Sequence, residues 1–186
     1  MDSVAALPPL RETIAAHGLD AKKRFGQHFL LDLNLTRRIA RAAAPLDQGT
    51  VIEIGPGPGG LTRALLLEGA TRVVAIEVDP RALGALRELQ AAAGGSLELI
   101  EADALRAKVR ELGPAPRRIV ANLPYNISTA LLVRWLHDAD DVTDMVLMFQ
   151  KEVVDRLVAE PRTKAYGRLS VLAQHVCEVR RLFDVA

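Results

Sequence analysis

The chain has 186 residues, of which 49% are hydrophobic and 25% are charged, as in a globular domain with a core of its own. The net charge of +1 excludes recognition of nucleic acid by overall charge, and the single cysteine, Cys177, excludes an internal disulfide. No apolar run reaches the roughly 20 residues that span a membrane, and no secretory signal pattern opens the sequence. We therefore expect a cytoplasmic protein that does not enter a membrane.

The predicted elements alternate between helices and strands along the chain. Helical spacing of apolar residues predicts helices at residues 8–17, 35–43, from 61, from 80, 129–137, 151–159 and 168–175. Apolar runs predict strands at residues 51–54, 72–78, 97–100, 118–121 and 145–149, with a last strand at 176–185. This alternation predicts an α/β fold with a doubly wound, mainly parallel sheet.

The histidines and the basic clusters indicate whether the chain would bind a metal ion or RNA. The four histidines lie far apart and lack the spacing of metal ligands, so we expect no bound metal. Basic residues gather in short clusters at residues 22–24, 37–41, 117–118 and 180–181. Such a cluster is more typical of a solvated face than of an RNA contact, so none of them alone indicates an RNA-binding surface.

The first predicted strand runs into a glycine-rich turn at residues 55–60 and then into a helix. This is how an α/β sheet presents a nucleotide-like cofactor. The glycine spacing also fits the G-x-G-x-x-G pattern of dinucleotide-binding proteins, which is a weak signal by itself. However, two prolines in the turn lack the N–H donors that hold a pyrophosphate, and Glu53 adds negative charge beside it. The turn therefore favours a cationic ligand without phosphate, such as S-adenosylmethionine.

Carboxylates follow the next two strands. Glu77 lies at the end of its strand, where an α/β nucleotide site places a carboxylate that accepts both ribose hydroxyls. Asp103 follows the third strand, where it can accept the exocyclic amine of an adenine or cap a helix from Leu105. The residues alone leave these two interpretations of Asp103 open.

The tetrad Asn122-Leu123-Pro124-Tyr125 follows the fourth strand directly. The Asn122 side-chain oxygen and the Leu123 carbonyl can accept both N–H bonds of an amine such as that of adenine, and Pro124 stiffens the turn. Tyr125 offers a flat face on which an extruded base can stack. Because Asn is neutral, the inferred catalysis is orientation and electrostatics without proton abstraction. Taken alone, the tetrad also fits a plain strand-end turn with a core tyrosine.

The sequence resembles the bacterial small-subunit rRNA adenine dimethyltransferases from about Lys22 to its last residue. The matching stretches are KRFGQHFL at residues 23–30, EIGPG at 53–57, IEVD at 76–79, DA at 103–104, NLPYNIST at 122–129, QKEVVDRL at 150–157 and AYGRLSV at 165–171. Residues 1–20 carry none of this resemblance. It implies an N-terminal extension, 1–21, and an S-adenosylmethionine-binding domain, 22–186, with the Rossmann-like class I methyltransferase fold.

The resemblance also implies a reaction. Two methyl groups pass from S-adenosylmethionine to the exocyclic N-6 amine of each of two adjacent adenosines. These lie in a hairpin near the 3′ end of small-subunit rRNA, and the partner is the rRNA within a precursor of the small ribosomal subunit. By the same resemblance, residues 122–125 are catalytic, and the cofactor is bound by His28, Leu30, Gly55, Glu77, Asp103 and Asn122. His28 stands where some members of the family have Asn.

Family members continue beyond the position of Ala186 with a Phe- and Pro-rich loop, a further strand and a small helical domain. The resemblance therefore implies that this chain is the catalytic domain alone. We expect it to bind the cofactor and to be poorly active on RNA. We also expect residues 176–185 to form an exposed sheet edge that is prone to pair between chains.

Three other functions share parts of this pattern. A large-subunit rRNA adenine methyltransferase of the antibiotic-resistance type has the same fold and mechanism. A ribosome-assembly or RNA-binding factor would keep the fold for placement alone. A dinucleotide oxidoreductase fits the glycine spacing, but the prolines of the turn and the tetrad speak against it.

Overall fold

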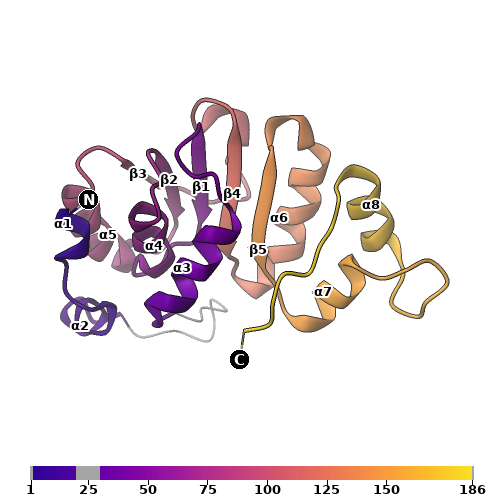
Figure 1. The fold of residues 1–186 in the computed structure, drawn as a ribbon, viewed down its shortest axis with the longest axis horizontal. Coiled ribbons are helices and arrows are strands. Elements are labelled where there is room, and N and C mark those ends of the chain that lie inside the picture. Colours follow the sequence, from indigo (N-terminus) through magenta and orange to yellow (C-terminus); the bar gives the residue numbers. More distant parts are fainter. Residues whose placement is uncertain (1, 20–29, 186) are drawn as a thin grey trace.

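The structure is a computed structural model that describes residues 2–19 and 30–185 (Figure 1). The stretch at residues 23–30 that resembles the family therefore lies, except for Leu30, outside the described residues, and the predicted cofactor contact of His28 lies there with it. The helices are α1 (Asp2–Ala5), α2 (Leu10–Ala16), α3 (Leu33–Ala42), α4 (Gly60–Leu67), α5 (Pro80–Ala92), α6 (Tyr125–His137), α7 (Lys151–Leu157) and α8 (Arg168–Val176), with 3-10 turns at η2 (Val109–Glu111) and η3 (Ala139–Asp141).

Within the described residues, five parallel strands form the sheet, and these are five of the six strands that the sequence predicts. They are β1 (Thr50–Ile54), β2 (Val73–Glu77), β3 (Leu97–Glu101), β4 (Arg117–Asn122) and β5 (Asp144–Met148), in the spatial order β3-β2-β1-β4-β5. Every residue of β1 and β2 is buried. Burial on both faces explains why these strands are nearly continuous apolar runs.

Helices cover both faces of the sheet, because successive strand residues point to opposite sides. Val51 and Val73 pack in one cluster with Ile39 of α3 and Leu65 of α4. Their neighbours along the strands pack on the other face in a second cluster that holds Trp135 of α6. Figure 1 shows the sheet with α3 and α4 in front, α1, α2 and α5 at one end and α7 and α8 at the other. The prediction of a doubly wound parallel sheet is therefore confirmed.

The carboxyl ends of the parallel strands meet at one edge of the sheet. There β1 enters the glycine turn, where Gly55, Gly57 and Gly59 have φ of +66°, +55° and +89°. These left-handed conformations are strained for any residue with a Cβ, so the turn requires its glycines. The chain then enters α4 at Gly60. The turn, the end of β2, the residues after β3 and the tetrad after β4 therefore share one edge.

The predicted last strand at residues 176–185 is wrong. Helix α8 includes Val176, and residues 177–185 follow without strand structure. Side chains hold this segment instead, because Cys177 and Val179 pack on the cluster around α6, α7 and α8, and Phe183 packs on the core beside α3. The Arg38 guanidinium lies 3.9 Å from the centroid of the Phe183 ring. Three of its apolar residues, Cys177, Val179 and Phe183, are thus half-buried against helices, and the sheet edge expected for this segment does not form.

Candidate active site

A cavity of about 150 Å³ lies at the carboxyl ends of β1, β2 and β4. The predicted cofactor residues within the described chain, Leu30, Gly55, Glu77, Asp103 and Asn122, all line it. The lining carboxyl groups belong to Glu53, Glu77, Asp79 and Asp103, and none of its described lining residues is Lys, Arg or His. The cavity is therefore rich in acceptors and lacks the cations that would balance a phosphate.

Glu77 is held in a fixed position by backbone donors. Its side chain is 4% exposed, and its Oε1 accepts from the N–H groups of Val78, at 2.9 Å, and Asp79, at 2.8 Å. Its Oε2 accepts from the N–H of Gly57 at 3.0 Å, which ties the end of β2 to the glycine turn. A carboxylate has about four acceptor positions, so capacity remains for a ligand hydroxyl.

Glu53 has the opposite environment, although it projects from the adjacent strand. It is 2% exposed, and its Oε2 has no hydrogen-bond partner within the described protein. Burial raises the pKa of Glu53 to about 8; contacts with Thr62 oppose this rise, and the negative charge of Glu77 adds to it. The carboxyl is therefore largely neutral at pH 7. The sequence analysis assigned a negative charge to Glu53 beside the glycine turn. That charge is present only above a pH of about 8 or when a cation is bound next to it.

Asp103 both lines the cavity and caps a turn. Its Oδ1 accepts from the N–H of Leu105 at 2.9 Å. Residues 104–106 form a turn that does not continue, so the helix from Leu105 that one of the two interpretations of Asp103 assumed does not form. Oδ2 lies 3.9 Å from Nε of Arg106, which is 89% exposed. The local cap therefore occupies one oxygen, and its presence does not decide between the two interpretations of this residue.

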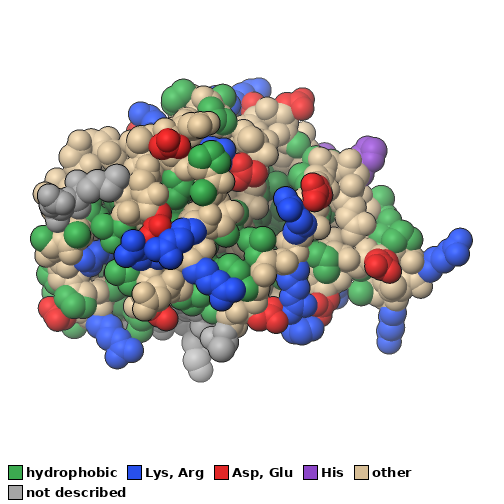
Figure 2. All heavy atoms as spheres, in the orientation of Figure 1, with side chains coloured by type: hydrophobic (Ala, Val, Ile, Leu, Met, Phe, Trp, Pro, Cys, Tyr) green, Lys and Arg blue, Asp and Glu red, His purple; other side chains and the backbone are tan. Residues whose placement is uncertain are grey.

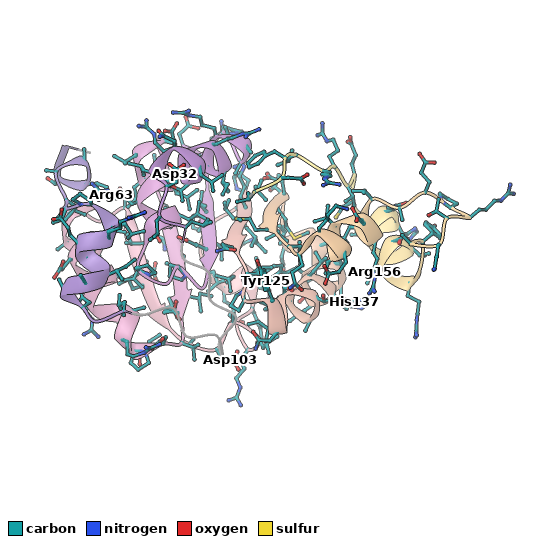
Figure 3. The ribbon with its side chains drawn as sticks, turned by 90° about the horizontal axis from the view of Figure 1, so that it is seen from below. Asp32, Arg63, Asp103, Tyr125, His137 and Arg156 are labelled. Atoms are coloured by element: carbon teal, nitrogen blue, oxygen red, sulfur yellow. The ribbon has the colours of Figure 1, made fainter. Side chains whose placement is uncertain are left out.

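The tetrad divides between the cavity, the core and the surface. Asn122, the last residue of β4, and Pro124 line the cavity. The Leu123 side chain is 1% exposed, which leaves only its backbone available to the site. Tyr125 is 37% exposed, does not line the cavity and lies at the start of α6 (Figure 3). The helix begins four residues earlier than predicted, because Pro124 with φ −58° supplies its N-cap.

Asp79 and Leu10 line the cavity but were missed by the sequence reasoning. Asp79 caps α5 through the N–H of Arg81, at 3.1 Å, and pairs with the Arg81 guanidinium. The position of Asp79, directly after a strand and before a proline, could have indicated that it lies at the cofactor site. No local pattern marks Leu10, since only the tertiary fold brings it to the glycine turn.

The basic clusters are largely paired with acids. Glu68 pairs with Arg37 and with Arg41, whose Nε lies 2.7 Å from the carboxylate, and these two arginines lower the pKa of Glu68. Arg118 pairs with Asp144 at 3.0 Å. Figure 2 shows Lys and Arg side chains over α3 and α4 with acidic side chains among them. The cluster at residues 22–24 lies outside the described residues.

Two features are absent from residues 2–19 and 30–185. No three His, Cys, Asp or Glu side chains gather there in a way that would hold a metal ion. None of the helices described has the length and apolar character needed to cross a membrane.

The family model described as ribosomal RNA adenine dimethylase matches residues 18–186. The chain belongs to this family. Proteins named ribosomal RNA small subunit methyltransferase A are similar to it. The one from Rhodospirillum rubrum is 66% identical over 96% of this chain and 62% of its own length. The one from Paramagnetospirillum magneticum is 65% identical over 98% of this chain and 65% of its own length. The chain thus spans a little under two thirds of these relatives.

Solved structures of the same fold include a dimethyladenosine transferase from Plasmodium falciparum, with 32% identity and a TM-score of 0.68 over 79% of this chain and 52% of that one. The 23S rRNA methyltransferase ErmE has 33% identity and a TM-score of 0.62 over 78% of this chain and 55% of that one. These likenesses confirm the predicted Rossmann-like methyltransferase fold of this family member.

Proposed function

We propose that this chain carries the catalytic site of a cytoplasmic S-adenosylmethionine-dependent rRNA adenine dimethyltransferase that acts on small-subunit rRNA. The observation that carries the proposal is the single cavity in which the glycine turn, Glu77, Asp103 and Asn122 converge. The small-subunit methyltransferase name of the relatives at 65–66% identity supports the choice of substrate.

The residues of the cavity fit S-adenosylmethionine. This cofactor is cationic at its ammonium and sulfonium groups, and the described lining has four carboxyl groups and no basic side chain. The unpaired Oε2 of Glu53 is a buried acceptor in need of a donor. Glu77, fixed by three N–H groups, is suited to accept ribose hydroxyls. The same acidic lining argues against a dinucleotide, whose pyrophosphate would meet carboxyls without compensating cations.

The bound cofactor would supply an electrophilic methyl group. The chain's task is then to orient an adenine amine, which is a poor nucleophile because its lone pair is delocalised into the ring. Asn122 at the cavity wall and the Leu123 backbone would accept its two N–H bonds and direct the lone pair toward the cavity. Tyr125, exposed at the start of α6, would stack on the extruded base. No residue of the tetrad is a strong base, so the barrier to methyl transfer would be lowered by orientation of the amine and by electrostatic stabilisation.

Two rRNA molecules are candidate substrates for this reaction, small-subunit rRNA and large-subunit rRNA. The fold likeness to the 23S rRNA methyltransferase ErmE favours large-subunit rRNA as the second candidate. Incubating the 186-residue chain with radiolabelled S-adenosylmethionine and separately with unmethylated small and large ribosomal particles distinguishes them. We expect weak label as dimethyladenosine in the small particles, because this chain is expected to be poorly active on RNA. Label in the large particles alone would transfer the proposal to the second candidate. No label in either, with S-adenosylhomocysteine still bound by the chain, would support a factor that only places RNA.

Tyr125→Ala tests the catalytic arrangement. Because Tyr125 does not line the cofactor cavity, we expect its loss to cut methylation of small particles at least tenfold while S-adenosylhomocysteine affinity changes less than twofold. Tyr125→Phe keeps the flat face and serves as the matched control, with methylation near the original rate. Normal methylation by the Ala variant would show that the stacking role is wrong.

A further inference from the structure

Residues 2–19, the N-terminal segment, are docked on α4 and α5, through Arg63 of α4 and through a contact of 3.0 Å between His17 and Glu88 of α5. The Arg63 guanidinium of α4 donates to three backbone carbonyls of this segment, those of Pro8 at 2.6 Å, Leu7 at 2.7 Å and Ala5 at 3.2 Å. Figure 3 shows Arg63 at the end of the molecule where the N-terminal helices lie. The first of these helices, α1, ends at Ala5, so the cation also lies at a helix C-terminus, where positive charge is favourable.

Two helical glycines make room for the segment. A Cβ at Gly60 would lie 2.8 Å from a methyl carbon of Leu10 and 2.7 Å from the carbonyl oxygen of Leu30. A Cβ at Gly84 of α5 would lie 2.9 Å from Nδ1 of His17. All three distances are shorter than ordinary van der Waals contacts, so a side chain at either position would displace Leu10 or His17 from its present place. Gly in a helix interior costs about 1 kcal/mol relative to Ala, and at Gly84 this docking is the visible compensation.

The docked segment brings Leu10 into the wall of the cofactor cavity. Leu10 and Leu30 both line the cavity beside the glycine turn, and Leu10 packs over Gly60. Leu10 also borders a second, smaller hollow that contains Arg63, between the segment and the two helices. Val4 and Leu19 are each 3% exposed, so the segment is anchored at both ends by buried apolar side chains.

We propose that Leu10 contacts the bound cofactor and that Arg63 is a positioning residue that holds Leu10 in place. The inference rests on the proposed function, since it assigns one more wall to the same cofactor site. Residues 2–17 precede the stretch that matches the family model, so the segment adds a contact that the family motifs do not include. Its chemistry is apolar, and it would shield part of the ligand from water on the side that the sheet edge leaves open.

Calorimetric titration with S-adenosylhomocysteine tests this in the 186-residue chain. We expect Leu10→Ala and Arg63→Gln each to raise the Kd roughly three- to tenfold. Arg41→Gln is the matched control, because it removes one cation from a pair with Glu68 that does not line the cavity, and its Kd should stay within twofold. The double variant should bind no more weakly than Arg63→Gln alone, because both changes remove the same contact.

Hydrogen exchange of residues 2–17 separates positioning from contact. In Arg63→Gln, the backbone amides of residues 2–17 should exchange faster than in the original chain. In Leu10→Ala, their exchange rates should stay within twofold of the original, although S-adenosylhomocysteine binds more weakly. Leu10 is only half-buried, so the second variant stays folded even if Arg63→Gln does not. Unchanged affinity in Leu10→Ala would overturn the inference alone. Failure of the original chain to bind S-adenosylhomocysteine would overturn the proposed function and this inference with it.

Discussion

Glu53 and Glu77 project into one cavity from neighbouring strands, but their carboxyl groups have different hydrogen-bond partners. Glu77 has three backbone N–H partners, whereas Oε2 of Glu53 has none within the described protein. A buried acceptor without a partner is costly unless a ligand or a proton satisfies it. The pair therefore combines an acceptor held in place by three N–H groups with a second carboxyl whose pKa burial raises to about 8.

The pH dependence of stability should report Glu53. Its pKa is about 8 in the folded chain and near 4.5 when the group is solvated. The folded state therefore holds a proton that the unfolded state releases, and the free energy of unfolding falls as pH rises from 4.5 to about 8, by a few kcal/mol at most. Glu53→Gln cannot ionise, so its melting temperature relative to the original chain should rise between pH 5 and pH 8. Parallel melting curves across that range would contradict the assignment.

Glu77→Gln should weaken binding of S-adenosylhomocysteine by tenfold or more. A charge-assisted hydrogen bond is worth about 1.5–3 kcal/mol, and an amide would also turn a donor toward one of the three backbone N–H groups. Glu98→Gln on the adjacent strand is the control, because Glu98 pairs with Arg72 at the surface. Calorimetry that shows equal affinity for both variants would remove Glu77 from the cofactor site.

At the scale of elements, burial on both faces explains why the strands of the sheet could be predicted from their apolar residues. Short-range signals were weaker. The capping residue Asp103 left a helix from Leu105 open, because the sequence does not show whether the turn continues. Residues 176–185 were predicted as a strand, but Cys177, Val179 and Phe183 are half-buried against helices, and only the tertiary fold distinguishes the two arrangements.

Phe183→Ala should loosen the segment at residues 177–185. Phe183 is half-buried on the core beside α3 and stacks with Arg38, so its truncation should lower the free energy of unfolding by about 1–2 kcal/mol. Leu182→Ala is the matched control, because Leu182 is 56% exposed and its loss should change stability by less than about 0.5 kcal/mol. Chemical denaturation measures both. Equal stabilities would show that side-chain docking does not hold the segment.

At the scale of the whole molecule, the sequence predicted which strand ends meet but not what closes the cavity around them. Gly55, Glu77 and Asn122 follow strands, and parallel topology alone brings such positions together. Leu10 lies far from all of them along the chain and has no local pattern that marks it. Its place depends on Arg63 and Gly60, whose roles are tertiary contacts that no periodicity encodes.

Charge pairing should also limit nonspecific RNA binding by the whole chain. The net charge is +1, and Glu68 pairs with both Arg37 and Arg41 on the face over α3 and α4. Glu68→Gln should therefore release two adjacent cations for phosphate contacts, and each such contact with a single strand adds about 0.7 to the magnitude of the slope of log Kobs against log salt.

Glu98→Gln changes the formal charge by the same amount but releases only Arg72. Fluorescence anisotropy with a short unstructured RNA between 50 and 200 mM salt, a range over which phosphate contacts weaken strongly, should give the steeper slope and tighter low-salt binding for Glu68→Gln. Because the two variants share one net charge, a difference between them must come from where the cations lie. Identical slopes would mean that RNA responds to total charge, and that the paired arginines over α3 are a solvated face rather than a latent phosphate-binding surface.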